Sequence, residues 1–463
     1  MGVADTLWLV EAVTRELSLF AGVGLLLGGL DDLAIDLIWL VRQSWRRLTR
    51  YRGGRRVTVA TLRAPARPGR IAVVIGAWHE AGVIGAMLET ACRRWGDADF
   101  RIYVGLYPND PETVAEVRAA AARDPRVRPV PGVIPGPTTK AEALNRCWTM
   151  LQADEAAAGE TVKAVLLHDA EDMVHPHEIR VFDSLIETLD LVQLPVLPLI
   201  DQDSRWVAGH YADEFAEAHG KQLVVREALG AGVPMAGTGC AIARHAIAAV
   251  AERNGGFPFT SDSLTEDYEL GLRLKSFGGR CAFVRIAEDA GGPPVAVRAY
   301  FPATFDAAVR QKCRWLRGIA FEGWDRLGWD GGIAERWMRL RDRRAPLAAL
   351  VLTVAYLIPP LVLMALALRL ELGLPLGPLY PVSALERATA ALLAWRLVMR
   401  VIVVTRLYGW REGLRAVPRL FVGNVIAMAA AGRALLHYAW PKRAPAIRWD
   451  KTTHAFPHRI AAE

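Results

Sequence analysis

The feature that most constrains the fold of this chain is its division into apolar ends and a polar middle. Residues 346–370 are apolar along nearly their whole length and exceed the ~20 residues that a membrane-spanning helix needs. Residues 17–30 form a shorter run, which reaches spanning length with its amphipathic flanks. Because a bilayer core offers no hydrogen-bond partners to the backbone, such runs fold there as helices. The sequence therefore predicts a polar domain held between membrane helices.

Two further C-terminal segments are weaker candidates. Residues 388–405 and 417–440 are apolar, but each contains two arginines, which are costly inside a membrane. If all three C-terminal segments crossed, the basic residues 442–451 would lie on the outer side, against the positive-inside rule. We therefore expect one of the weaker segments to lie in the membrane interface as an amphipathic helix.

The basic residues of the chain are clustered. Seven arginines fall within residues 42–56 and five within residues 336–344, in a chain of net charge +7. A nucleic-acid binder can show such runs. Here each run adjoins an apolar segment, so the positive-inside rule is the better explanation, with a cytoplasmic middle domain and no nucleic-acid partner. The five cysteines are scattered without paired spacing, which fits a reducing compartment.

The middle of the chain, residues 57–335, has the pattern of an α/β domain. Residues 71–75, 100–105 and 162–167 are predicted as buried strands, and helical patterns over 83–94 and 111–123 separate them. Alternation of this kind predicts a mostly parallel sheet. An acidic motif directly follows the third strand, at the edge where open α/β sheets bind their ligands.

That acidic motif contains Asp169, Glu171 and Asp172. Asp169 and Glu171 can share a hard cation, Mg²⁺ or Mn²⁺, and such an ion stabilises a departing diphosphate. Asp172 is a rival ligand, and a solvated acidic turn is the structural alternative. A zinc site with the nearby His175 and His177 is a minor alternative, because no matching ligands stand elsewhere in the sequence.

A second motif, Thr265-Glu266-Asp267, opens a helical pattern. Thr265 is predicted as the N-cap, and all three residues can be read as capping groups. A carboxylate held at this position can instead remove a proton from an acceptor hydroxyl. We assign this role of general base to Asp267.

A third motif carries Gln311, Arg314 and Trp315, whose spacing puts them on one face of an amphipathic helix. Arg314 is suited to bind a phosphate and Trp315 to stack on a sugar or an acceptor. Anchoring of the helix at the membrane by the Arg-Trp pair is the alternative, and the two roles are compatible.

In this order the motifs resemble the membrane-integrated family 2 glycosyltransferases, which include cellulose, chitin and hyaluronan synthases. The resemblance covers most of residues 70–320. It implies a GT-A-like nucleotide-sugar-binding domain, an inverting transfer from a UDP-linked sugar, and catalytic roles for Glu266, Asp267, Gln311, Arg314 and Trp315.

Smaller matches add binding residues to this resemblance. The nucleotide and substrate set that it implies is Trp78, Glu80, Asp110, Lys140, Asp169, Gly237, Thr238, Trp449, Lys451 and Thr452. His79 departs from the family pattern, which has Asn there. The last three residues resemble a gating segment that closes over the diphosphate, so they are expected on the cytoplasmic side.

Three segments, residues 168–176, 224–229 and 449–457, resemble more closely the inner-membrane transferases of a bacterial phage-adsorption system. This resemblance implies exopolysaccharide synthesis at the inner membrane, an outer-membrane partner protein and contact with membrane lipids. It also puts direct regulation by cyclic di-GMP in doubt, because the chain ends soon after Pro457. Single addition to a lipid-linked acceptor, or a non-catalytic scaffold, are the alternatives.

The resulting division has four parts. Residues 1–56 are expected to form a membrane anchor with a basic flank, and 57–335 the catalytic domain. Residues 336–440 are expected to form membrane and interface helices, and 441–463 a cytoplasmic gating-like tail.

Overall fold

The structure of the chain is a computed structural model that describes residues 2–51, 56–379, 381–440 and 454–458. Its centre is a seven-stranded sheet in the order β3-β2-β1-β4-β7-β5-β8, with a separate parallel pair, β6-β9. The strands are β1 Ile71–Gly76, β2 Phe100–Leu106, β3 Val127–Pro131, β4 Ala164–His168, β5 Leu191–Gln193, β6 Val196–Leu199, β7 Cys240–Ala243, β8 Cys281–Phe283 and β9 Val297–Tyr300.

The sheet is mostly parallel, as the sequence predicts. Strands β1 to β4 run parallel to one another, and only the pairs of β7 with β4 and with β5 are antiparallel. The strand order reverses beside β1, between β2 and β4, which creates a crevice at the carboxyl ends of the strands. The predicted strands over 71–75, 100–105 and 162–167 correspond to β1, β2 and β4, although β4 begins two residues later than predicted.

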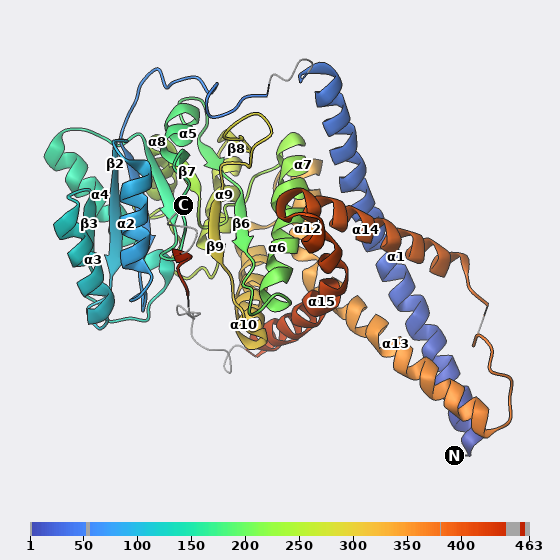
Figure 1. The fold of residues 1–463 in the computed structure, drawn as a ribbon. Coiled ribbons are helices and arrows are strands. Elements are labelled where there is room, and N and C mark those ends of the chain that lie inside the picture. The colour runs from blue at the N-terminus through green and yellow to red at the C-terminus, as the bar shows by residue number, and fades with distance from the viewer. Residues whose placement is uncertain (1, 52–55, 380, 441–453, 459–463) are drawn as a thin grey trace.

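Helices cover both faces of this sheet (Figure 1). They follow the βα alternation as far as β4, and α2 and α3 lie where the helical patterns predict them. The helices of this part are α2 Ile84–Trp95, α3 Pro111–Arg123, α4 Lys140–Ala158, α5 Glu178–Leu185, α6 Val207–Glu217, α7 Leu223–Ala228, α8 Arg244–Arg253, α9 Glu266–Ser276, α10 Phe305–Leu316, α11 Glu322–Leu327 and α12 Ile333–Arg343, with the π-helical turns η1 Ala218–Gln222 and η2 Arg317–Phe321.

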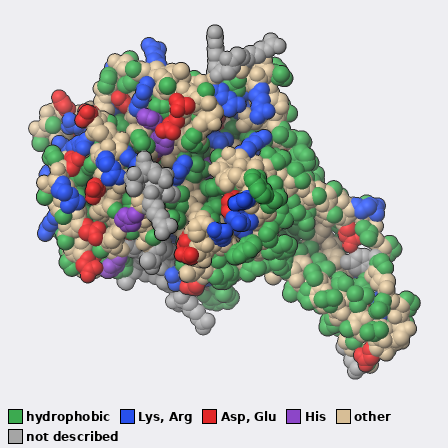
Figure 2. All heavy atoms as spheres, in the orientation of Figure 1, with side chains coloured by type: hydrophobic (Ala, Val, Ile, Leu, Met, Phe, Trp, Pro, Cys, Tyr) green, Lys and Arg blue, Asp and Glu red, His purple; other side chains and the backbone are tan. Residues whose placement is uncertain are grey.

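Four long helices form the rest of the molecule: α1 Val3–Thr49, α13 Ala345–Glu371, α14 Ala384–Tyr408 and α15 Trp410–Ala439. Of these, α13, α14 and α15 are long and apolar enough to cross a membrane. The predicted anchor over 17–30 is the middle of the much longer helix α1. In Figure 1, α1 and α13 run side by side away from the sheet, and Figure 2 shows hydrophobic side chains gathered on this projection.

Three of the four arginines that interrupt the two weaker apolar segments have acidic partners in the sheet domain or in α1. Arg419 of α15 is fully buried and forms a bidentate pair with Asp213 of α6, at 2.8 and 3.0 Å. Arg400 of α14 donates to Glu217 at 2.6 Å. Breaking such buried pairs leaves an uncompensated charge. One face of α15 is therefore bound to the sheet domain.

Candidate active site

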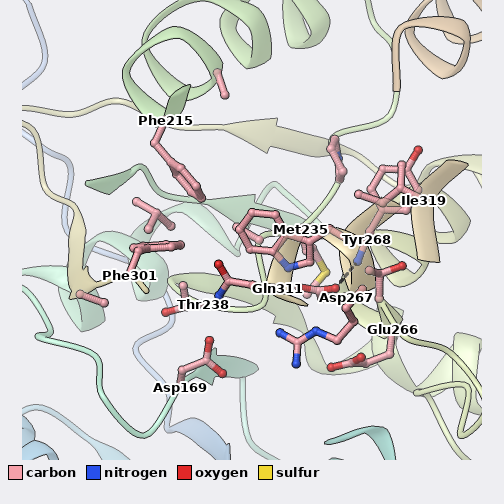
Figure 3. Close-up of a pocket in the computed structure, with 18 of the residues that line it drawn as sticks. Asp169, Phe215, Met235, Thr238, Glu266, Asp267, Tyr268, Phe301, Gln311 and Ile319 are labelled. Carbon is pink, nitrogen blue, oxygen red and sulfur yellow. Dashed lines mark hydrogen bonds between the residues drawn. The ribbon is translucent and has the colours of Figure 1, made fainter. Parts of the chain in front are cut away.

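A cavity of about 510 Å³ opens at the carboxyl ends of β1 and β4. The three sequence motifs meet in its wall, as Figure 3 shows for Asp169, Asp267 and Gln311. The predicted site residues that line it are Glu80, Lys140, Asp169, Glu171, Thr238, Glu266, Asp267, Gln311, Arg314 and Trp315. The volume is in the usual range for a small-molecule site.

The two carboxylates of the first motif have different partners. Asp169 accepts a hydrogen bond from the ammonium of Lys140, the first residue of α4. Glu171 lies instead beside Glu80 and His454, and one ligand atom from each of these three residues lies within 4.8 Å of the others. Burial alone would raise the pKa of Glu171, but the imidazole of His454 outweighs it and lowers the pKa to about 2.

His454 is thus the unexpected member of the site. Burial would lower its pKa, but the carboxylates of Glu171 and Glu80 raise it to about 10. Its Nδ1 lies 3.1 Å from Glu80 and 3.2 Å from Glu171. The buried ring of Phe456, two residues on, packs into the core of the sheet domain and holds this segment in place. A single histidine far along the chain carries no local signal, so the sequence did not indicate it.

Asp172 supports the acidic loop from beneath. Its Oδ2 accepts hydrogen bonds from the backbone N–H of Asp169 and the hydroxyl of Thr238, and lies 2.8 Å from Nδ1 of His168. The other ring nitrogen of His168 lies 3.0 Å from Glu178. All of these side chains are buried. Asp172 is therefore engaged in holding the loop, and its part as a rival metal ligand is weakened.

The second motif begins α9 and faces the same cavity. Burial raises the pKa of Asp267, although Lys140 opposes this, and burial with the neighbouring Asp267 raises the pKa of Glu266 to about 7. Thr265 is the N-cap as predicted, but its hydroxyl makes no capping bond and has no hydrogen-bond partner among the described residues. The capping function that the sequence suggested is thus not performed by this side chain.

The third motif lies on α10, with Gln311, Arg314 and Trp315 all reaching the cavity. Trp315 belongs to an aromatic cluster with Phe215, Phe301 and Tyr211, whose ring centroids lie 4.9 to 6.5 Å apart. Aromatic faces of this kind suit a sugar ring or an apolar group. Gln311 Oε1 is buried without a partner in the part of the chain that the structure describes.

The remaining predicted residues lie at the margin or beyond it. Trp78 packs on Tyr107 behind the cavity, and Asp110 caps α3 and accepts from the backbone of His79 at 2.6 Å. Gly237 lies directly against the carboxylate of Asp267. The gating-like Trp449, Lys451 and Thr452 lie outside the described residues.

Comparison with known proteins agrees with this geometry. Residues 68–318 match the family described as "Glycosyltransferase like family 2". The chain belongs to this glycosyltransferase family. It is 37% identical over 468 aligned positions to Bacteriophage adsorption protein B of Escherichia coli K12 and to Bacteriophage N4 adsorption protein B of Escherichia coli O157:H7. The match covers 96% of this chain and 62% of each relative, so the glycosyltransferase chain spans less than two thirds of their length.

Among solved structures, a mannosyltransferase from Pyrobaculum calidifontis, in complex with GDP-Man and Mn²⁺, has a TM-score of 0.54. The likeness covers 94% of this glycosyltransferase and all of that chain, at 16% identity. It shows that the chain has a GT-A-like fold.

Proposed function

We propose that this glycosyltransferase moves a sugar from a nucleotide donor, UDP-linked in our expectation, to an acceptor hydroxyl with inversion. The observation that carries the proposal is the position of Asp267. Its carboxylate faces the cavity within electrostatic reach of Lys140, Asp169 and Arg314. A base, a cationic group for the diphosphate and an aromatic wall are thus supplied by one cavity.

In this reaction Asp267 removes the proton of the attacking hydroxyl. Its raised pKa brings it closer to the operating pH, which improves a general base. Lys140 and Arg314 are the cations that would neutralise the diphosphate as it leaves, and Trp315 would orient the acceptor. Glu266 lies beside the base, and its carboxyl group adds a negative charge to the site when it loses its proton.

The residues present fit a divalent cation. Glu80, Glu171 and His454 offer two carboxylates and an imidazole close together, and Asp169 lies on the same loop. Carboxylates suit Mg²⁺ and Mn²⁺, and the added imidazole favours Mn²⁺. When bound there, the ion would supply electrostatic stabilisation of the leaving diphosphate.

The setting we propose is the bacterial inner membrane, with the catalytic part in the cytoplasm and the product an exopolysaccharide. The kinship with phage adsorption proteins supports this setting and an outer-membrane partner. Single addition to a lipid-linked acceptor is the second candidate. It is favoured by the apolar side chains of Ile319 and Met338, which line the cavity where it approaches Arg344 at the start of α13.

The test is a donor screen on the purified membrane protein. We expect release of nucleoside diphosphate from one UDP- or GDP-sugar with Mn²⁺ or Mg²⁺, and loss of release with a chelator. The length of the product separates the two candidates, since a ladder indicates polymer synthesis and one added sugar a single transfer. Absence of release from every donor would contradict the proposal.

The metal set has its own comparison. His454→Gln is expected to raise the Mn²⁺ concentration for half-maximal release at least about tenfold, a cost known even for groups that only support a ligand. His458→Gln changes an exposed residue of the same short segment and is expected to leave it unchanged. Equal responses of the two variants would exclude His454 as a ligand.

A further inference from the structure

The last turn of α12 contacts the catalytic part and the membrane helices at once. Asp342 accepts a hydrogen bond from the hydroxyl of Tyr268 at 2.7 Å. Arg341 and Arg344, close to Asp342 along the chain, pair with Asp31 and Asp32 of α1. Because α13 begins at residue 345, this turn leads directly into a candidate membrane span.

Tyr268 is the residue after Asp267 and lies with it in the first turn of α9. Consecutive side chains on a helix point about 100° apart. The carboxylate of Asp267 therefore faces the cavity, while the phenol of Tyr268, which also lines the cavity, extends to Asp342 of α12. A bond that fixes Tyr268 also fixes the rotation of this turn, and with it the direction of the Asp267 carboxylate.

The hydrogen bond between Tyr268 and Asp342 is supported by burial and by a further ion pair. Tyr268 is buried, and burial together with Asp342 raises its pKa well above the usual value, so the phenol keeps its proton and donates. Asp342 is held in turn by Arg226, whose Nη1 lies 2.9 and 2.8 Å from the two carboxylate oxygens. Arg226 is itself buried and donates to the carbonyl of Gly232 through Nε.

We propose that Asp342 is a positioning residue for the catalytic base, which it orients through Tyr268 and ties to the helix that enters the membrane. This inference rests on the proposed function, because it concerns the base of that reaction. This positioning gives α12 a role in the reaction, although α12 contains none of the three sequence motifs. The last turn of α12 bonds both to α1 and to Tyr268. The orientation of the Asp267 carboxylate therefore depends on how the membrane helices pack against α12.

The experiment compares Tyr268→Phe, Asp342→Asn and the double variant in release of nucleoside diphosphate at varied donor concentration, with water as acceptor. Misplacing a catalytic group by about 1 Å can cost ~100-fold in rate, so we expect kcat to fall about tenfold to 100-fold. Donor KM is expected to stay within about twofold, since donor binding is not removed. The double variant is expected to be no slower than the slower single variant, because both changes break one link.

The matched control is a second tyrosine–aspartate bond between the catalytic part and a long helix. Tyr438 of α15 donates to Asp325 of α11 at 3.2 Å, away from Asp267. Tyr438→Phe and Asp325→Asn are expected to keep the kcat of the unaltered protein.

Three results would overturn the positioning role: an unchanged kcat in Tyr268→Phe, additive losses in the double variant, or a raised donor KM with unchanged kcat. Tyr268→Phe removes a single oxygen, so it keeps the test open if Asp342→Asn does not fold. Turnover by the unaltered protein with no loss in the variants leaves the proposed function standing. Absence of turnover in the unaltered protein contradicts the proposed function, and this inference falls with it.

Discussion

At the scale of single residues, the site depends on a glycine as much as on its carboxylates. Gly237 has a φ of +74°, a region that favours glycine. A Cβ built there would lie 2.4 Å from Oδ2 of Asp267 and 3.4 Å from Nζ of Lys140. The backbone at Gly237 thus lies directly against the carboxylate of Asp267, and a side chain at position 237 would displace that carboxylate.

This contact predicts the effect of Gly237→Ala. The left-handed backbone costs an alanine ~1 kcal/mol in stability, and the clash displaces the carboxylate of Asp267. We expect a fall in kcat of at least about tenfold, measured as release of nucleoside diphosphate.

Gly230→Ala is the control for backbone strain alone. Gly230 has a φ of +75°, and its Cβ would meet nothing within 4 Å among the described residues. It should lose similar stability, measured by thermal unfolding, while keeping its rate. Equal rates for the two variants would show that Gly237 does not support the base.

At the scale of elements, α1 is a structural part of the molecule as well as an apolar segment. Asp31 lies 2.6 Å from the indole nitrogen of Trp337 and pairs with Arg344, and Asp36 accepts from the indole of Trp395 at 2.9 Å. Lys221 of η1 also pairs with Asp36. Acidic residues of α1 thus bind α12, α14 and the catalytic part together.

Removing one of these acidic charges should therefore weaken the packing of α1 against the rest of the molecule. Asp31→Asn removes one of the two carboxylates that pair with Arg341 and Arg344 and leaves Asp32 as the other, at a cost of ~1–3 kcal/mol, below that of a fully buried pair. We expect a clearly lower Tm in thermal unfolding of the detergent-solubilised protein. Glu16→Gln breaks only the exposed pair with Arg15, worth at most ~1 kcal/mol, and should leave Tm nearly unchanged. Equal Tm values for Asp31→Asn and Glu16→Gln would contradict a stabilising role for the ion pairs of Asp31.

The same scale shows what the sequence could predict. Strands β1, β2 and β4 are predictable because buried parallel strands are continuous apolar runs, and α3 because residues 111–123 carry a helical pattern. The full extent of α1 was missed because its polar residues face partners that come from distant helices. The role of Arg419 was ambiguous for the same reason, since its partner Asp213 lies in α6.

The candidate site divides in a similar way. Residues within compact motifs, such as Asp267 and Arg314, were recognised because local spacing carries the signal. His454 and Asp342 were not, because each reaches the site by a tertiary contact over a long sequence separation. Pairing of Asp169 with Lys140 was equally invisible, since both were assigned to the nucleotide without a bond between them.

At the scale of the whole molecule, the helices give a consistent orientation. The N-terminal part of α1 lies beside the end of α13, where Arg369 donates to Glu11 at 2.6 Å. The N-terminal end of α1 and residues 372–379 are thus at the far end from the sheet, as Figure 1 shows. With the arginine-rich ends of α1 and α12 on the catalytic side, the positive-inside rule predicts that the far end lies outside.

Labelling of a cysteine variant tests this orientation. Pro375→Cys, in the exposed turn between α13 and α14, should react with a membrane-impermeant maleimide in intact spheroplasts. The native cysteines, which include the partly exposed Cys92 and Cys281, should react only after permeabilisation. Labelling of the unaltered protein in intact cells, or of Pro375→Cys only after permeabilisation, would contradict the orientation.

The central claim is that Asp267 is the base of a nucleotide-sugar transferase, and the ratio of turnover to donor binding in Asp267→Asn tests it most directly. The side chain keeps its shape but no longer accepts a proton, so we expect release of nucleoside diphosphate to fall by about 100-fold or more. Donor affinity, measured by titration calorimetry on the same sample, should stay close to that of the unaltered protein. Turnover that survives in Asp267→Asn, or that falls only in step with donor binding, would contradict the account.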